Sequence, residues 1–329
     1  MTRKQLNTVT GPIDVENLGP TLMHEHLRID FPGWKSNTKL PPLQTHEEMV
    51  DICIKNIRGL QERGVKSLLD PCPIDLGRDV KLAEEVSSKT GFQIICATGL
   101  YKEEWGGAPY WKFRRHFGLG GADEMADLFI HELTKGIGDT GIKAGIIKVA
   151  TGLGEISDYD MSVIEAAAMA SVETGAPITT HTEEGSGGDF QQKILMDAGV
   201  PAHQIIIGHS CGTDDHDYHM NLLDKGTYIG FDRFGITPEY PDEKRVASLL
   251  RLLKKNKGNR IVVGQDSCWC SAGGSIPAEV FATLDQDVVF NPLHFHDHII
   301  PQLLAGGATQ EQIDQLLIDN PRRFFLGEK

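Results

Sequence analysis

Short runs of apolar, often β-branched residues alternate with longer amphipathic stretches along the whole chain. Runs that are apolar at successive positions, rather than at every second one, are typical of strands buried on both faces of a parallel sheet. Eight such runs are present, covering residues 19–26, 65–72, 92–99, 144–152, 176–183, 204–210, 227–232 and 260–266. We therefore predict eight buried strands.

The stretches between these runs carry apolar residues at the spacing of an amphipathic helix. The clearest is EEMVDICIKNIRGLQERG, whose final Gly64 suits the end of a helix. We predict helices over residues 46–63, 79–90, 122–139, 160–175, 187–199, 214–225 and 242–257. Further helical segments follow the eighth run, including 309–320, which Pro321 is expected to end.

Strands that alternate with helices eight times predict an α/β fold, specifically a closed (β/α)8 TIM barrel. The 329 residues contain no linker or low-complexity stretch, so we expect a single domain over 1–329. The alternative is an open doubly wound sheet, which normally has a glycine-rich phosphate turn after its first strand. Here the first run ends in His-Glu-His instead. The region 267–295 is expected to form a loop over the mouth of the barrel.

Charge and composition indicate which classes of partner are disfavoured and which cell compartment is expected. The formal net charge of −14 disfavours nucleic acid and anionic membrane surfaces, which both attract basic proteins. The N-terminal residues lack the apolar run of a secretory signal, and no apolar stretch is long enough to predict a membrane span. The six cysteines are scattered, with Cys72 and Cys96 in apolar runs and Cys268 and Cys270 at a spacing that fits zinc sites poorly. We expect a cytoplasmic protein without disulfides.

Polar residues of chemically similar kinds follow several of the predicted strands. The active sites of TIM barrels lie at the carboxyl ends of the strands, where such residues would meet. They are His24, His26, Lys148, His181, His209 and Asp266. Two histidines two positions apart on a strand face the same way and can share one metal ion. Each of the six residues alone is more often an ordinary hydrogen-bonded strand end, but together they predict a metal site.

Lys148 is unusual because it lies within an apolar run, GIIKVA. A charged lysine there would cost several kcal/mol, and burial lowers the pKa of its amine. Such an amine can react with carbon dioxide to form a carbamate that bridges two metal ions. The alternative is a lysine paired with a carboxylate inside the barrel. Two metals would activate a water molecule, and Asp266 could bind one metal and also move the proton.

With these residues in place, the chain resembles the phosphotriesterase family of the amidohydrolase superfamily, and most closely its phosphotriesterase-like lactonases. The similarity runs almost from end to end. It includes TVTGPI, LGPTLMHEHL, CATGLY, FRRHFG, AGIIKVATG, PITTHTEEG, IIIGHS, IGFDRFG, GQDS and NPRRFF.

The resemblance implies a binuclear centre, with zinc expected first and cobalt, manganese or iron as alternatives. His24, His26 and Asp266 would bind the more buried ion, and His181 and His209 the more exposed one. An N6-carboxylated Lys148 and a hydroxide would bridge them. The hydroxide would attack a lactone carbonyl or a phosphorus centre while Asp266 takes its proton. The family also implies a small-molecule substrate and a homodimer.

The resemblance extends to two residues near the substrate. Arg233 matches an arginine after strand seven, although an ion pair with Asp232 or with a neighbouring loop would also explain it. Tyr101 matches a tyrosine thought to orient the lactone. Related lactonases often have a further tyrosine beside it, whereas Lys102 and Glu103 follow here, so the register of this tyrosine stays open by a residue or two. Trp269 is expected to pack in the loop after strand eight.

The first functional hypothesis is a lactonase for acyl-homoserine or other γ- and δ-lactones, hence a quorum-quenching enzyme, with weak organophosphate hydrolysis. The second is a dedicated phosphotriesterase. A barrel that binds metal without catalysis is disfavoured by the complete ligand set, and a mononuclear deaminase by Lys148. We discount HFHDH at 294–298 as a metal site, because it lies in a helical segment, and expect His216 and His219 on the surface.

Overall fold

The computed structural model describes residues 4–39, 42–274, 283–285 and 288–329. Eight parallel strands form one sheet in the order β11-β10-β9-β8-β7-β6-β5-β3. They are β3 (Thr21–Leu22), β5 (Ser67–Asp70), β6 (Gln93–Gly99), β7 (Ile146–Lys148), β8 (Ile178–Thr179), β9 (Ile205–Ile207), β10 (Tyr228–Phe231) and β11 (Ile261–Val263). Each lies within one of the eight predicted runs.

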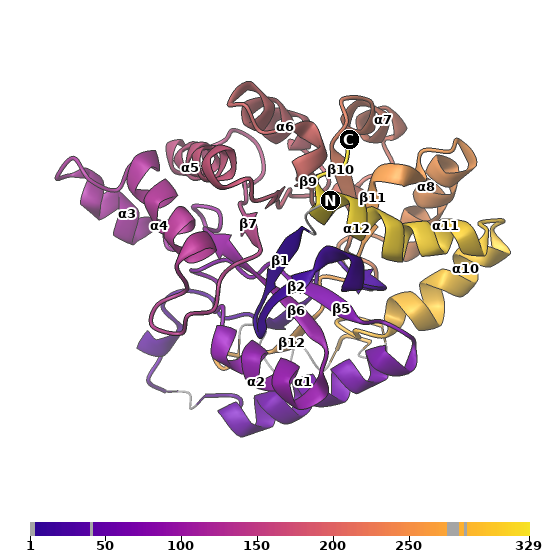
Figure 1. Ribbon diagram of the computed structural model, residues 1–329, viewed down its shortest axis with the longest axis horizontal. Helices are drawn as coiled ribbons and strands as arrows, with labels where there is room; N and C mark the ends of the chain where they lie inside the picture. The colour runs from indigo at the N-terminus through magenta and orange to yellow at the C-terminus, as the bar shows by residue number, and fades with distance from the viewer. Residues whose placement is uncertain (1–3, 40–41, 275–282, 286–287) are drawn as a thin grey trace.

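Backbone hydrogen bonds between the first and last strands close the sheet into a barrel. The N–H of Met23 donates to the carbonyl of Val263 at 2.8 Å, and the N–H of Asp266 donates to the carbonyl of His24 at 3.0 Å. The predicted TIM barrel is therefore confirmed, and the open doubly wound alternative is wrong. Figure 1 shows helices arranged around the strands.

Seven helices correspond to the predicted ones. They are α1 (His46–Glu62), α2 (Val80–Thr90), α4 (Ala122–Thr134), α5 (Asp158–Thr174), α6 (Gly188–Asp197), α7 (His216–Asp224) and α8 (Asp242–Lys254). A capping box of Thr45 and Glu48 starts α1, and Gly64 follows its end with a φ of +83°. Helix α4 ends five residues before the predicted limit at residue 139, and Gly136 beyond it has a φ of +140°, outside the helical region.

Two parts of the helical prediction were wrong or incomplete. Helix α3 (Ala108–Arg115) was not predicted. Pro321 does not end the C-terminal helix: α11 (Gln310–Asp314) runs through a π-helical turn at Gln315–Asp319 into α12 (Asn320–Leu326). Proline is tolerated there because it directly follows the π-helical turn, where the regular pattern of α-helical hydrogen bonds is already interrupted. Helix α10 (Ile300–Ala305) similarly follows a π-helical turn at Phe295–Ile299.

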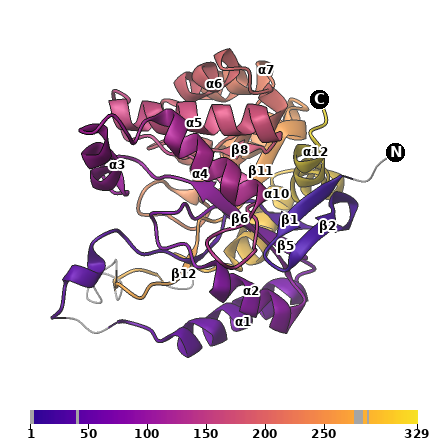
Figure 2. The ribbon, with the colours of Figure 1, turned by 60° about the vertical axis from the view of Figure 1, so that its left-hand side comes forward.

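An N-terminal hairpin that the hydrophobic pattern did not predict closes the amino end of the barrel. Strands β1 (Gln5–Thr8) and β2 (Gly11–Asp14) pair antiparallel. Leu6 of β1 and Phe324 of α12 pack in one cluster with the barrel residues Ile146, Tyr228 and Val262. In Figure 2 the hairpin and α12 lie at one side of the molecule, and α3 and β12 lie at the other.

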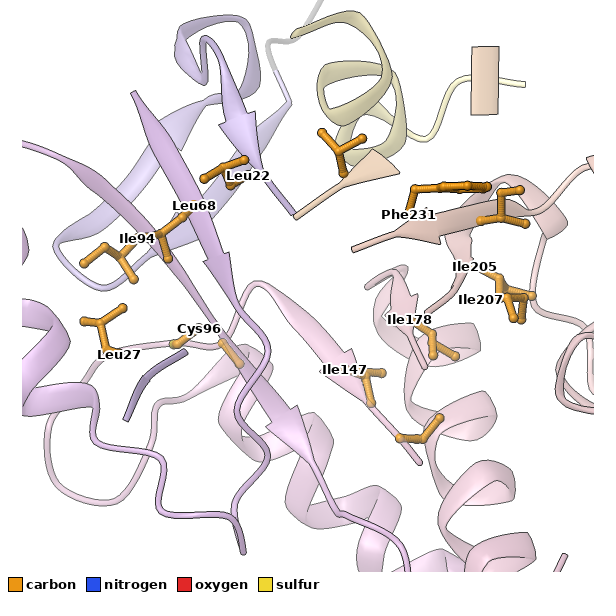
Figure 3. Close-up of a cluster of buried hydrophobic side chains, with 14 of the residues drawn as sticks. Leu22, Leu27, Leu68, Ile94, Cys96, Ile147, Ile178, Ile205, Ile207 and Phe231 are labelled. Atoms are coloured by element: carbon orange, nitrogen blue, oxygen red, sulfur yellow. The ribbon is translucent and has the colours of Figure 1, made fainter. Parts of the chain in front are cut away.

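A second hydrophobic layer lies between the barrel and its helices. Alternate strand residues, such as Leu68, Ile147 and Phe231, belong to this layer and not to the cluster inside the barrel. Figure 3 shows this side of several strands. Because Ile147 belongs to the outer layer and Ile146 to the inner one, Lys148 follows on the inner side, at the carboxyl end of β7.

The chain directly after Asp266 folds back onto the mouth of the barrel. Strand β12 (Cys268–Cys270) pairs parallel with β4 (His26–Arg28). Trp269 is buried, as expected for a packing residue, and its indole N–H donates to the Ser267 hydroxyl at 2.7 Å. Much of the remaining expected loop, at 275–282 and 286–287, lies outside the described residues.

Two further expectations concern the state of the cysteines and membrane-spanning helices. All six cysteines are free thiols, and Cys72 and Cys96 are buried as predicted. No helix in the described part of the chain combines the length and the apolar character that a membrane span requires.

Candidate metal centre

The six predicted ligands come together at the carboxyl end of the barrel. All are buried or nearly so; Asp266 is the most exposed, at 9%. One oxygen of Asp266 lies 3.4 Å from Nε2 of His24 and 3.1 Å from Nε2 of His26, and its other oxygen lies 3.7 Å from Nε2 of His209. The rings of His181 and His209 are 4.6 Å apart between centroids. Four histidines and one carboxylate therefore line one small volume.

Asp266 and His209 both have backbone conformations that non-glycine residues rarely adopt. Their φ angles are +52° and +57°. Such conformations cost about 1–3 kcal/mol and persist where the surroundings impose them. For Asp266, the backbone on both sides is held by hydrogen bonds from Gln265 and Ser267 to one side chain, that of Glu25.

Glu25 is that side chain, and it is fully buried between the two predicted histidine ligands. Its carboxyl group accepts hydrogen bonds from the N–H of Gln265 at 2.8 Å and the N–H of Ser267 at 3.3 Å, and also binds the Ser267 hydroxyl. Burial raises the pKa of Glu25 to about 8, although these hydrogen bonds oppose the rise. Glu25 thus fixes both neighbours of Asp266, a role that the sequence reading missed.

Two further buried carboxylates hold the outer nitrogens of three histidines. Asp232 lies 3.2 Å from Nδ1 of His24 and 3.0 Å from Nδ1 of His209, and it also accepts the backbone N–H of His209. Asp70 lies 3.3 Å from Nδ1 of His26. This arrangement leaves Nε2 of all three histidines facing the site, as is usual for metal-binding histidines.

The strand that carries Asp232 is shaped to hold this carboxylate. A Cβ atom at Gly230 would lie 2.2 Å from an oxygen of Asp232, so only glycine leaves room for the side chain. From the sequence, Asp232 is expected only as an ion-pair partner of Arg233. Arg233 instead pairs with Asp266 at 2.9 Å and with Glu239, in the neighbouring loop, at 2.7 Å.

Burial keeps most of these histidines neutral, so that each retains a lone pair for a metal ion. Burial, assisted by the charge on Lys148, lowers the pKa of His24 to about 4. Burial also lowers the pKa of His181 to about 3 and that of His209 well below its ordinary value. Burial opposes ionisation of Asp266, but the charge on Arg233 and the hydrogen bond with His26 hold its pKa well below the ordinary range.

His26 differs from the other three histidines. Burial lowers its pKa, but hydrogen bonds to Asp266 and Asp70 on either side outweigh this effect and raise it well above the ordinary value. A histidine between two carboxylates attracts a positive charge, which is either a proton or a metal ion. A cation between Nε2 of His26 and Asp266 would replace that proton.

The site residues fit divalent metal ions. His24, His26 and Asp266 each offer a ligand atom, and these atoms lie within 4.8 Å of one another. Nε2 of His209 is buried and has no hydrogen-bond partner among the described residues. Imidazole nitrogens and a carboxylate suit zinc and neighbouring transition metals. The geometry thus brings the predicted ligands together in an arrangement that a metal would complete.

Lys148 lies inside this cluster without a close partner of opposite charge. Its Nζ is 3.4 Å from Nε2 of His24 and 3.4 Å from the carbonyl of Thr180. Among the described residues, no carboxylate lies within ion-pair distance of this nitrogen, which disfavours the alternative of a lysine paired inside the barrel. Burial lowers the pKa of Lys148 to about 8, although Asp266 and Asp232 oppose the change.

Tyr101 lies beside His181 at the edge of the site. Its hydroxyl lies 3.5 Å from both ring nitrogens of His181, too far for a strong hydrogen bond. Burial raises the pKa of Tyr101 well above its ordinary value, so the hydroxyl keeps its proton. Beside it, Glu183 contacts His181 and the buried Lys102, and the sequence reading missed this pair.

Two histidine clusters lie outside the site, and one expectation about them was wrong. His294 of the HFHDH segment pairs with Asp242 at 2.7 Å. His219 was expected on the surface but is fully buried, on the inner face of α7, and contacts the carbonyl of Ser210 at 2.7 Å. The helical pattern places His219 beside the buried Leu222 and Leu223, a signal that could have indicated its burial.

A sequence model described as "Phosphotriesterase family" matches residues 4–325. The chain belongs to the phosphotriesterase family. The resemblance seen in the sequence is thereby confirmed, and the chain is a metal-dependent hydrolase of this family. A phosphotriesterase homology protein from Mycobacterium tuberculosis is 36% identical over 98% of this chain and 97% of its own length.

Solved structures of this family match the whole fold. The organophosphorus hydrolase from Deinococcus radiodurans has a TM-score of 0.92 at 37% identity, covering 98% of this chain and 97% of that one. A second structure is described as engineering of organophosphate hydrolysis activity from a weak promiscuous lactonase template. It has a TM-score of 0.91 at 36% identity and covers 97% of this chain and 99% of that chain.

The depressed histidine pKa values predict how the metal-free protein responds to acid. The unfolded chain binds protons at its histidines near pH 6.5, whereas folded His24 and His181 do not until about pH 4 and 3. Stability should therefore fall as the pH drops from 6.5 towards 4, by up to about 1.4 kcal/mol per pH unit for each such histidine. His26 stays protonated in both states over this window. Glu25, with its raised pKa, makes the folded state more stable as the pH drops, but this one group opposes several histidines with lowered pKa values.

Urea unfolding of the chelator-treated protein at pH 6.5, 5.5 and 4.5 measures this slope. The variant His181→Gln removes one of the titrating groups and should show a shallower dependence on pH. Equal slopes for the variant and the native protein would contradict the assignment of a depressed pKa to His181.

Proposed function

We propose that this protein is a lactonase that hydrolyses γ- and δ-lactones, acyl-homoserine lactones among them, with phosphotriester hydrolysis as a weaker activity. The observation that carries the proposal is the Tyr101 hydroxyl, which stays protonated beside His181 at the mouth of the site. When a lactone ring opens, the ring oxygen is released as an alkoxide. An alkoxide is a poor leaving group, and a hydrogen-bond donor assists its release. An activated aryl phosphotriester has a good leaving group and needs no such donor.

The chain's own residues divide the work of hydrolysis. A water oxygen bonds to the lactone carbonyl carbon, the ring C–O bond breaks, and a proton reaches the released oxygen to give a hydroxy acid. In this proposal Asp266 accepts the proton of the water and passes it on, and Arg233, 2.9 Å from it, keeps it ionised. Tyr101 donates a hydrogen bond to the substrate.

We propose that two divalent ions complete the site, with zinc first and cobalt, manganese or iron as alternatives. When bound, they would activate the water and polarise the substrate oxygen. His24, His26 and Asp266 would hold one ion, and His181 and His209 the other. We further propose that Lys148 is N6-carboxylated and holds both, because its amine is buried, has a lowered pKa and lacks a carboxylate partner.

The second candidate function is a dedicated phosphotriesterase. The observation in its favour is the 37% identity to a protein named organophosphorus hydrolase. The same ligands and the same proton acceptor would serve both reactions, so the substrate preference separates them.

The preference can be measured as the ratio of kcat/KM for a long-chain acyl-homoserine lactone to that for a paraoxon-like triester. We expect the lactone to be favoured by about 100-fold or more, equivalent to about 2.7 kcal/mol in transition-state binding. Tyr101→Phe should lower the ratio, because it removes the donor that only the lactone needs. A native ratio that favours the triester would establish the second candidate instead.

Asp266→Asn should lower kcat for both substrates by about 100- to 10,000-fold, because the amide cannot accept the proton. Metal analysis of each preparation would separate loss of the proton acceptor from loss of metal. Asp139→Asn, which changes a carboxylate that is 94% exposed, serves as the control. Full activity in the Asp266 variant would show that another group moves the proton.

We also propose that the protein forms a homodimer. Exposed aromatic side chains on and beside α3 support an interface there: Tyr110, Phe113 and Phe117 are 60%, 65% and 69% exposed. Clusters of exposed aromatic residues are costly in water and are typical of interaction surfaces.

Light scattering should give twice the mass of one chain for the native protein. Phe113→Asp combined with Phe117→Asp should give the mass of one chain, since a charge in an apolar interface is costly. Phe190→Asp changes a half-exposed aromatic residue on α6 and should leave the mass unchanged. A native protein with the mass of a single chain would rule out the dimer.

A further inference from the structure

The ring of His181 is held differently from the other three histidines of the site. His24, His26 and His209 each have a carboxylate at Nδ1, which leaves Nε2 facing the site. In His181 it is Nε2 that contacts a carboxylate, at 2.9 Å from an oxygen of Glu183. A carboxylate at this distance accepts a hydrogen bond, so Nε2 carries the proton and Nδ1 carries the lone pair.

Glu183 is itself held by a buried cation. The Lys102 ammonium is only 2% exposed and forms an ion pair with the same oxygen of Glu183 that contacts His181. The ammonium also lies over the ring of Trp105, 3.5 Å from its centroid. A buried lysine is costly without such partners, and Lys102 is therefore tied to Glu183.

The backbone of His181 is fixed independently of this pair. Its N–H donates to the carbonyl of Val149 at 2.9 Å, and its carbonyl accepts a hydrogen bond from the Gln191 amide at 2.8 Å. The Tyr101 hydroxyl, 3.5 Å away, is too distant to orient the ring. The contact with Glu183 is thus the strongest restraint on the rotation and the tautomer of the His181 ring.

We infer that Glu183, anchored by Lys102, is a positioning residue that commits His181 to bind the more exposed metal ion through Nδ1. A histidine that donates its outer N–H to a carboxylate is a more basic and better oriented ligand. Lys102 occupies the position after Tyr101, where the sequence departs from related lactonases. Its function here is to hold Glu183 against His181. The inference rests on the proposed function, because it requires a metal ion at His181.

Metal retention tests the inference without relying on activity. The native protein and its variants are loaded with zinc and dialysed against increasing concentrations of a chelator, and bound zinc is measured by mass spectrometry. In Glu183→Ala, one of the two ions should be released at about 10- to 100-fold lower chelator concentration. Glu183→Gln should release zinc at a chelator concentration between those of the native protein and Glu183→Ala, because an amide oxygen can still accept a hydrogen bond from the N–H of His181. Lys102→Met should shift release in the same direction as Glu183→Ala.

Glu184→Gln is the matched control, because it changes the neighbouring carboxylate, which is exposed. It should retain zinc like the native protein. Circular dichroism checks that each variant folds. A native protein that binds fewer than two zinc ions would refute the proposed binuclear site. Two ions in the native protein and unchanged retention in Glu183→Ala would refute only the role of Glu183.

A crystal structure of the zinc-loaded native protein identifies the ligand atom directly. The expected result is zinc at Nδ1 of His181, with Nε2 hydrogen-bonded to Glu183. Zinc at Nε2, or bound by an oxygen of Glu183 itself, would overturn the inference, because Glu183 would then not orient the ring from its outer side.

Discussion

Backbone hydrogen bonds join the end of the last strand to the end of the first, among them the bond from the N–H of Asp266 to the carbonyl of His24. They close the barrel, and they bring together side chains that belong to opposite ends of the sequence. The Nε2 atoms of His24 and His26 can face Asp266 only because of this closure. Glu25 strengthens the same junction by binding the residues on both sides of Asp266. The fold and the candidate site therefore share a single structural constraint.

The hydrophobic pattern predicted the barrel because the pattern is local and is repeated eight times. Parallel strands bring their carboxyl ends to one rim, so the six strand-end residues could be expected to meet before any distance was known. The N-terminal hairpin was missed because QLNT and GPID each contain a single aliphatic residue instead of an apolar run, and β2 also includes Pro12. Pro321 misled because a π-helical turn directly before it interrupts the regular hydrogen bonds and lets the helix continue past the proline.

Only those site residues whose type is unusual at their position could be predicted from the sequence. Histidines at strand ends and a lysine in an apolar strand are unusual enough to be noticed. Glu25, Asp232 and Glu183 are ordinary acidic residues in a sequence, and each gains its role from the residue it contacts. Asp232 contacts histidines from two other strands, a relation that depends on register and on the space that Gly230 leaves. Membership of the phosphotriesterase family identifies a hydrolase but does not supply this geometry.

The two ends of the barrel are built by different parts of the chain. The candidate ligands lie at the carboxyl end, whereas the N-terminal hairpin and α12 meet at the opposite end, where Leu6 and Phe324 pack against residues inside the barrel. Stability and reactivity are therefore assigned to opposite faces of one barrel. A substitution under the hairpin can weaken the fold without touching a side chain of the site, and a substitution at the site can change the chemistry without loosening the hairpin.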